Sequence, residues 1–275
     1  MLSYSLKKLC INERKGFKNM AVLQGSFLSS EIGRLSHFTV ILPHDTVTNP
    51  PAKGYPVLYI LPGRTDDCNT WLYRTNIERY AYFKGLAVVI PSGDGSFYAN
   101  MANGSRYFTM ITKELPEVVR NMFRVGFSRQ HTYICGAAMG GYGALRCALT
   151  FPEQYAGCIA LSPVADIEDF VNKEISAGKT DCWRAILGDR MLIPRDMDLN
   201  NLVSESHTYS QIQPLIYLAC GKRDELYPYV VRLRDMLDRS KMDFIFEQAD
   251  AGHEWGFWDI AVQRGLDAVI PDGSR

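Results

Sequence analysis

The chain has 275 residues, 47% of them hydrophobic, and this fits one soluble globular domain. Thirty Lys and Arg residues balance thirty Asp and Glu residues, so charge gives no reason to expect nucleic acid or a membrane surface as a partner. A small-molecule ligand is the expected partner, and a homo-oligomer is left open.

Residues 1–19 carry several Lys and Arg residues with little periodicity, so we interpret them as a poorly ordered extension, with a functional basic tail as the alternative. From residue 20 onward, short apolar runs alternate with longer helical segments, which is typical of parallel βαβ units. The predicted strands follow a strand-like start at 20–23 and cover 38–42, 57–61, 87–90, 132–135, 158–161, 216–219 and 244–248. The predicted helices cover about 71–83, 108–123, 142–149, 229–237 and 255–266.

The segment from about 166 to 209 interrupts this alternation with mixed charge and an irregular Pro-Arg-Asp run. Insertions between late strands of an α/β sheet commonly cover the carboxyl ends of the strands, so we interpret this one as a cap. An irregular surface excursion is the alternative. The predicted fold class is α/β, of the α/β-hydrolase type: a mostly parallel central sheet flanked by helices, with a small cap insertion in a single domain over 20–275.

The seven cysteines are odd in number, scattered and without C-x-x-C spacing, which argues against a disulfide framework and against a zinc site. No stretch approaches the roughly 18 apolar residues of a membrane span, and the first residues lack a signal-peptide pattern. We therefore expect a cytoplasmic protein.

Residues 134–143 read Ile-Cys-Gly-Ala-Ala-Met-Gly-Gly-Tyr-Gly, the pattern of a nucleophile elbow with a different residue at its centre. In the G-x-S-x-G arrangement a serine sits on a strained turn between a strand and a helix, where its hydroxyl can attack a carbonyl. Gly136 and Gly140 keep the required spacing, but Ala138 occupies the serine position. The pattern therefore predicts a hydrolase scaffold that lacks its nucleophile.

The other catalytic groups follow from chain order, which in α/β-hydrolases runs nucleophile, acid, histidine. Only His207 and His253 lie downstream of the elbow, and His253 is the expected base because it follows the last predicted strand, whereas His207 lies in the cap-like segment. The loop after the preceding strand offers Asp224 and Glu225. We choose Asp224 for its position and shorter arm, because Glu225 suits the first turn of the next helix.

The oxyanion of acyl transfer needs preorganised donors. The backbone N–H of Met139, just after the elbow, is one expected donor, and that of Arg64, in the loop after strand 57–61, is the other. The Arg64 side chain could meet a carboxylate-bearing or polar substrate, or could point to solvent. Gly63, Tyr98 and Trp255 are the expected substrate contacts.

Together these residues resemble the bacterial tributyrin esterase group of the esterase D family, α/β-hydrolases related to S-formylglutathione hydrolases and feruloyl esterases. The resemblance covers nearly the whole chain from residue 20, and its matching segments are 38–43, 58–63, 71–76, 91–98, 113–116, the elbow, 221–227 and 252–255. It departs at Pro62, where the family usually has histidine.

The resemblance implies catalytic roles for position 138, Asp224 and His253, without a metal or organic cofactor. It also implies a serine carboxylesterase that hydrolyses short acyl or hydroxycinnamoyl esters through an acyl-enzyme. A thioesterase or an acyltransferase on the same fold is the alternative. We interpret Ala138 as an engineered Ser→Ala change that makes this chain inactive, and a natural ligand-binding protein without catalysis is the other explanation.

Overall fold

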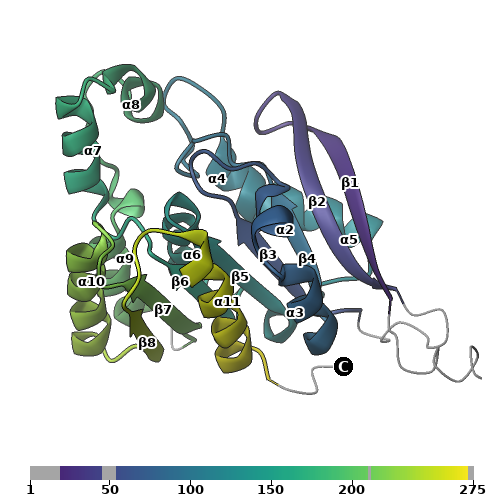
Figure 1. Cartoon of the computed structure of the whole chain (residues 1–275). Helices are drawn as coiled ribbons and strands as arrows, with labels where there is room; N and C mark the ends of the chain where they lie inside the picture. Colours follow the sequence, from purple (N-terminus) through teal and green to yellow (C-terminus); the bar gives the residue numbers. More distant parts are fainter. Residues whose placement is uncertain (1–18, 45–53, 210–211, 272–275) are drawn as a thin grey trace, which may run out of the picture.

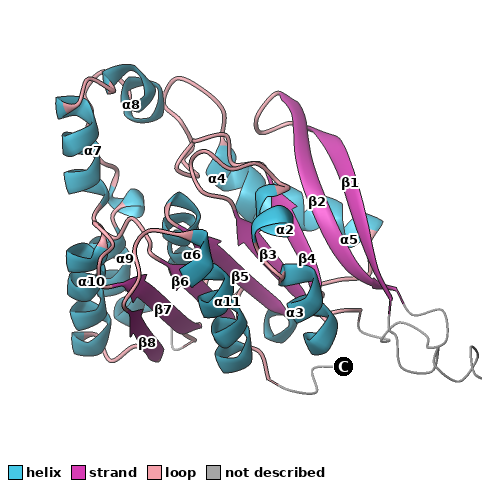
Figure 2. Ribbon diagram, viewed as in Figure 1, coloured by secondary structure: helices cyan, strands magenta, loops and turns pink. Residues whose placement is uncertain are grey.

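The structure is a computed structural model that describes residues 19–44, 54–209 and 212–271. One sheet forms its centre, with the strand order β1-β2-β4-β3-β5-β6-β7-β8 (Figures 1 and 2). The first two strands, β1 (Asn19–Ser29) and β2 (Arg34–His44), form an antiparallel hairpin at one edge. The other six are mutually parallel: β3 (Val57–Leu61), β4 (Ala87–Pro91), β5 (Thr132–Ala137), β6 (Gly157–Leu161), β7 (Leu215–Gly221) and β8 (Phe244–Ala249).

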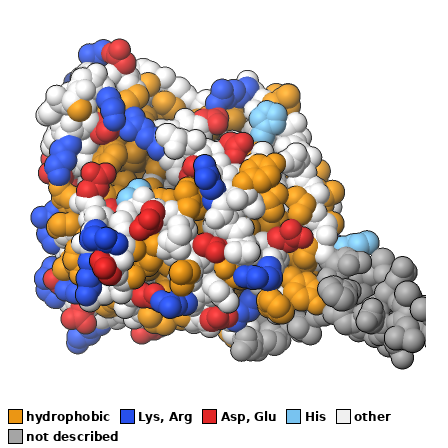
Figure 3. All heavy atoms as spheres, in the orientation of Figure 1, with side chains coloured by type: hydrophobic (Ala, Val, Ile, Leu, Met, Phe, Trp, Pro, Cys, Tyr) orange, Lys and Arg blue, Asp and Glu red, His pale blue; other side chains and the backbone are white. Residues whose placement is uncertain are grey.

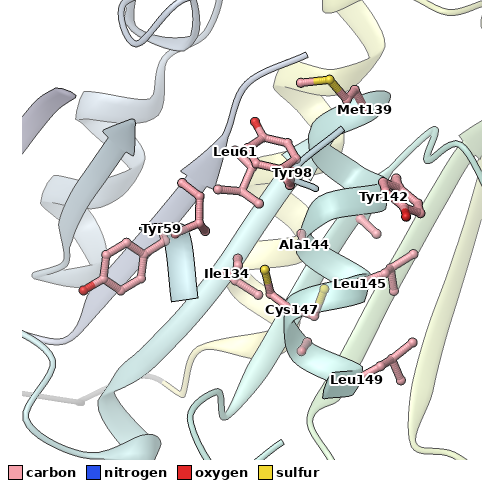
Figure 4. Packing of buried hydrophobic residues seen from close by; sticks show 14 of the residues in the cluster. Tyr59, Leu61, Tyr98, Ile134, Met139, Tyr142, Ala144, Leu145, Cys147 and Leu149 are labelled. Atoms are coloured by element: carbon pink, nitrogen blue, oxygen red, sulfur yellow. The ribbon is translucent and has the colours of Figure 1, made fainter. Parts of the chain in front are cut away.

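The predicted mostly parallel sheet, flanked by helices, is confirmed. Every residue of β3 and β4 is buried, as expected for strands covered on both faces. Because side chains alternate along a strand, Tyr59 and Leu61 join one apolar cluster with α6 (Met139–Thr150). Leu58 and Ile60 join a second cluster on the opposite face, with α11 (Trp255–Val269). Figure 4 shows the first cluster, where side chains of β3, β5 and α6 interlock.

The predicted helix over 71–83 is wrong at its middle, where the chain forms two helices, α2 (Thr70–Arg74) and α3 (Ile77–Lys84). Asn76 donates both its backbone N–H and its side-chain amide to Asp259 of α11, at 2.8 and 2.9 Å. Thr75 is extended. The break is therefore stabilised by a residue far away in the sequence, which local periodicity does not report.

The predicted helix over 108–123 contains a change of helix type. It begins as α4 (Tyr107–Thr109), continues through a π-helical turn at Met110–Glu114 and ends as α5 (Leu115–Met122). Pro116 lies in the first turn of α5, where its missing N–H costs no intrahelical hydrogen bond. The proline therefore marks the point at which the α-helical geometry of α5 begins.

The cap-like segment divides into two parts. Helices α7 (Ile167–Ser176) and α8 (Thr180–Leu187) project beyond the sheet (Figure 1). Helix α9 (Leu199–Tyr209) instead packs beside α6 and α10 (Tyr227–Arg239) in the helical layer. The division into an extension and one domain stays a prediction, and residues 1–18 of the extension lie outside the described residues. Within the described residues, no helix combines the length and apolar character needed to cross a membrane.

Candidate active site

The turn at Ala138 joins β5 to α6 and has the strained backbone expected of an elbow. Its φ of 53° and ψ of −118° place a non-glycine residue in a sparsely populated conformation. A hydrogen bond from its N–H to the carbonyl of Leu161, at 2.9 Å, stabilises this conformation. Ala137 and Met139 are buried, whereas Ala138 is partly exposed. The elbow therefore presents a methyl group at its tip.

The two glycines of the motif are required by close contact between backbones. A Cβ on Gly136 would lie 2.2 Å from the carbonyl carbon of Gly140, and a Cβ on Gly140 would lie 1.8 Å from the carbonyl oxygen of Leu61. No side chain fits at these distances without moving the backbone. Gly140 thereby brings the start of α6 against the end of β3, so the elbow lies beside the loop that contains Arg64.

Asp224 and His253 form the acid–base pair that chain order predicts. Nδ1 of His253 lies 2.8 Å from Oδ2 of Asp224, whose side chain is completely buried, while the His253 side chain is 34% exposed. Oδ1 of Asp224 accepts a hydrogen bond from the Leu226 N–H at 2.9 Å. Glu225 is exposed to solvent. The structure therefore joins Asp224 to the histidine.

The environment of Asp224 keeps its carboxylate ionised. Burial acts to raise its pKa, but the hydrogen bonds with His253 and with the Leu226 N–H, together with the nearby Ser162 hydroxyl, outweigh burial and hold the pKa below its usual range. A carboxylate against Nδ1 favours the tautomer with its proton on Nδ1, which leaves Nε2 as an acceptor. His253 can then take a proton from a group presented to Nε2.

The order of strands accounts for this convergence. Ala138, Asp224 and His253 follow β5, β7 and β8, whose carboxyl ends share one edge of the sheet. The loop before His253 packs on the end of β7, because the N–H of Arg223 donates to the carbonyl of Ala251 at 2.9 Å. A Cβ on Gly221 would lie 2.2 Å from that carbonyl oxygen, so this contact depends on glycine.

The expected oxyanion donors stand on two elements. Met139 is the first residue of α6, so its N–H has no acceptor within the helix. Arg64 lies in the loop after β3, and two side chains secure the residues before it. Asp66 Oδ2 accepts from the Gly63 N–H at 3.0 Å, and the Tyr98 hydroxyl donates to the Pro62 carbonyl at 2.7 Å.

These bonds change the roles expected for Gly63 and Tyr98. The Gly63 N–H is already bound to Asp66, and a Cβ there would lie 2.6 Å from the same carboxylate oxygen. Tyr98 is completely buried beneath the loop, so contact with a ligand does not fit its position. The hydrogen bonds of both residues therefore fix the conformation of the loop after β3. Trp255 is half-buried between Trp71 and Trp258, and its ligand contact stays a prediction.

The Arg64 side chain points to the cap, neither free for an anionic substrate nor directed to solvent. Its guanidinium forms an ion pair with Glu174 of α7 and lies 3.5 Å from Sγ of Cys182 in α8. Glu174 also accepts from Lys179 at 2.7 Å. The guanidinium carbon lies 5.8 Å from the centre of the Phe97 ring. The charge is therefore balanced by the cap, which corrects both readings of this arginine.

A cavity of about 170 Å³ lies between α7 and the start of α10. We call it the α7–α10 pocket, and it is lined by Val164, Ala165, Asp166, Asp169, Phe170, Lys173, Glu174, Glu225, Leu226 and Tyr229. It adjoins the elbow and the acid, because the Val164 N–H lies 3.4 Å from the Ala138 carbonyl and Leu226 binds Asp224. Figure 3 shows hydrophobic side chains gathered in a hollow below the projecting helices.

Two residues near the acid–base pair were missed from the sequence. Ser162 directly follows β6 with a φ of 43° and is completely buried, and Trp258 lies one turn into α11. The indole Nε1 of Trp258 lies 3.2 Å from Oγ of Ser162. The only local signal was a Ser-Pro pair after a predicted strand, which is common in ordinary turns.

The chain is similar to known proteins over most of its length. A family model described as "Putative esterase" matches residues 29–260. An acetyl esterase of Caldicellulosiruptor saccharolyticus is 31% identical over 262 residues, which cover 90% of this chain and 97% of that protein.

Two solved structures from Staphylococcus aureus share the fold. The fluorophosphonate-binding serine hydrolase FphF has a TM-score of 0.84 at 30% identity, covering 92% of this chain and 99% of its own. An S-formylglutathione hydrolase has a TM-score of 0.80 at 30% identity, covering 92% and 100%. The fold is therefore of the α/β-hydrolase type, and its neighbours are serine hydrolases.

Proposed function

We propose, from the premise that this chain belongs to the esterase family matched above, that its site is that of a serine carboxylesterase whose nucleophile is replaced by alanine. In this form the chain binds carboxylic esters and scarcely hydrolyses them. The observation that carries the proposal is the 2.8 Å bond between His253 and the buried Asp224, at the same sheet edge as an elbow with the strained backbone of the motif. A hydrolase needs this arrangement for proton transfer. The fold does not need it, because core packing requires neither a buried carboxylate nor a histidine beside it.

With serine at position 138, the chemistry would proceed in two steps. His253 would accept the hydroxyl proton at Nε2 while the serine oxygen attacks the ester carbonyl, and the N–H groups of Met139 and Arg64 would meet the developing oxyanion. His253 would then return the proton to the departing alcohol. Water, activated by His253, would release the acid from the acyl-enzyme.

Alanine at this position removes only the attacking atom. In a well-studied serine protease, loss of the nucleophile alone lowers turnover by about 10⁶-fold, while binding groups and oxyanion donors still act. The retained parts of this site should therefore hold an ester in place with very slow turnover. An engineered Ser→Ala change and a natural alanine both give this behaviour, and the codon at 138 in the source gene distinguishes them.

The volume of the pocket and the similarity to known esterases both bear on the substrate class. We assign the acyl group to the α7–α10 pocket, which adjoins the elbow although Ala138 and His253 are not in its lining. Its volume of about 170 Å³ is smaller than the roughly 300–1,000 Å³ typical of sites for drug-sized ligands, which favours short acyl groups. Similarity to an acetyl esterase points the same way. A hydroxycinnamoyl ester is the second candidate. Thioester hydrolysis is the alternative activity, favoured by the similarity to an S-formylglutathione hydrolase, and acyl transfer to an alcohol is a further one.

The test is the Ala138→Ser protein, assayed with p-nitrophenyl esters of increasing acyl length, a feruloyl ester and an S-acyl glutathione. We expect hydrolysis that is fastest for the shortest acyl chains, with covalent labelling by a fluorophosphonate. The parent chain should bind a short ester in calorimetry without labelling. The matched control is Ala138→Ser with His253→Ala. A folded Ala138→Ser protein without activity on any of these substrates would refute the proposal.

The cellular setting is also a proposal. Cys68, Cys135, Cys147, Cys158, Cys182 and Cys220 are unpaired, which suits the reducing cytoplasm. A small-molecule ligand without nucleic-acid or membrane partners stays a prediction, as does a homo-oligomer.

A further inference from the structure

Trp258 contacts the acid–base pair with two different parts of its indole ring. The indole packs against the imidazole of His253 in a T-shaped arrangement, with ring centres 4.7 Å apart and planes at 88°. Its Nε1–H points to Oγ of Ser162 at 3.2 Å. Trp258 is only 6% exposed, so this N–H needs an acceptor inside the protein. The Trp258 side chain thereby contacts His253 and Ser162 at the same time.

Ser162 connects this indole to Asp224. It follows β6 and is secured by a hydrogen bond from its backbone N–H to the Ala219 carbonyl on β7, at 2.7 Å. Its hydroxyl lies near the Asp224 carboxylate and acts to lower the pKa of that carboxyl. Strands β6 and β7 pair directly, so the residues that follow them are neighbours. Ser162 thus lies between Trp258 of α11 and the Asp224 carboxylate.

The direction of these hydrogen bonds is set by the groups themselves. An indole N–H only donates, so it occupies a lone pair of the Ser162 oxygen and leaves the hydroxyl proton free for another acceptor. Cys220 lies nearby, but burial, together with the Asp224 charge, raises its pKa to about 12, so at neutral pH it is a neutral thiol. The ionised Asp224 is the stronger acceptor, which favours a serine proton directed to it.

We propose that Trp258 and Ser162 are positioning residues that hold the Asp224 carboxylate and the His253 imidazole in the orientation for proton transfer. The four side chains form a ring of neighbours. The indole donates to Ser162, the imidazole bonds to the carboxylate and the two aromatic rings pack together, while Ser162 lies beside the carboxylate and lowers its pKa. His253 lies on a loop and is 34% exposed, and its bond to Asp224 alone would leave the ring free to tilt. The indole packed against the imidazole removes this freedom.

The geometric part of this inference holds for the chain with Ala138, and only its catalytic consequence rests on the proposed function. Proton NMR can therefore test the geometry without an ester. An imidazole Nδ1–H held against a carboxylate and shielded from water gives a downfield signal that exchanges slowly. We expect this signal in the parent chain and its broadening or loss in both Ser162→Ala and Trp258→Phe.

The matched control is Trp71→Phe. Trp71 is also completely buried and belongs to the same row of edge-packed tryptophans, but its Nε1–H has no hydrogen-bond partner among the described residues. We expect this variant to keep the signal. Thermal unfolding identifies variants that are folded. A signal that persists unchanged in folded Ser162→Ala and Trp258→Phe, or that is lost equally in Trp71→Phe, would overturn the proposal.

The kinetic arm uses the Ala138→Ser background. Each of Ser162→Ala and Trp258→Phe should lower kcat roughly tenfold, the loss of about one hydrogen bond, with little change in KM. The double variant should lose no more than either single one, because both interrupt the same ring. Fully additive losses, or a change confined to KM, would contradict a positioning role. An inactive Ala138→Ser parent would count against the proposed function and leave the NMR result to decide this inference.

Discussion

Arg64 and Glu174 form an ion pair that ties the loop after β3 to helix α7 of the cap. The peptide N–H of this arginine is the expected oxyanion donor, while its guanidinium contacts Glu174 and Cys182 in the cap helices. Both side chains are mostly buried, with 30% and 13% exposure. The position of the cap and the shape of the expected oxyanion hole are therefore coupled through one residue.

We expect Glu174→Gln to destabilise the protein by about 1 kcal/mol, because it leaves a largely buried guanidinium without its carboxylate. The unfolding midpoint should fall by about 2–4 °C in thermal scans. In the Ala138→Ser background, kcat should fall as well. The matched control is Glu205→Gln, whose pair with Arg195 is 42% and 78% exposed and should contribute little. Equal shifts for both variants would argue against the coupling.

Asp224 and Glu225 are adjacent carboxylates, and we expect only Asp224 to have a large effect on kcat. In the Ala138→Ser background we expect Asp224→Asn to lower kcat by about 10⁴-fold, as the equivalent change does in a serine protease, because an amide favours the wrong imidazole tautomer. Glu225→Gln should leave kcat within about twofold, since this side chain is exposed and does not contact His253, and any effect of its place in the lining of the α7–α10 pocket should fall on KM. Steady-state kinetics with one short ester measures both. A large loss in Glu225→Gln would mean that the acid is assigned wrongly.

Two helical glycines should respond oppositely to alanine. Gly140→Ala would place a Cβ 1.8 Å from the Leu61 carbonyl oxygen, so we expect a loss of about 3 kcal/mol or more in unfolding free energy. Gly256→Ala meets no atom within 4 Å and should be neutral or stabilising by up to about 1 kcal/mol. Denaturant unfolding compares the two. Similar stabilities would show that α6 and β3 can separate without cost.

Asp66 should make stability depend on pH in an unusual direction. Burial raises its pKa above 3.8, despite the hydrogen bond from the Gly63 N–H. A carboxyl whose folded pKa exceeds its unfolded pKa favours folding only when protonated, so its ionisation lowers stability as pH rises through the folded pKa.

Asp66→Asn keeps an acceptor for the Gly63 N–H and removes the charge. We therefore expect the unfolding midpoint at pH 7 to rise by about 1–2 °C, with the gain disappearing below about pH 3.5. Thermal scans across this range measure the difference between variant and parent. A gain that is independent of pH would show that the charge is not its cause.

Local patterns were sufficient for the strands and for the pairing of Asp224 with His253. Each predicted strand lies within or matches an observed one, because buried parallel strands have short apolar sequences bounded by turn residues. Asp224 and His253 could be chosen because parallel strands bring their carboxyl ends to one edge, so residues after successive strands converge. The single helix over 71–83 failed because Asp259, distant in the sequence, stabilises the break at Asn76.

The sequence by itself determined that a strained glycine-flanked turn carries a methyl group at Ala138, since spacing and residue type are local properties. It also determined which loops carry an acid and a base. Only the tertiary structure decided that Arg64 belongs to the cap, that Tyr98 lies beneath the loop and that Trp258 reaches both Ser162 and His253. These contacts join residues on different elements, and packing chooses among many partners that would satisfy the same charge or hydrogen bond.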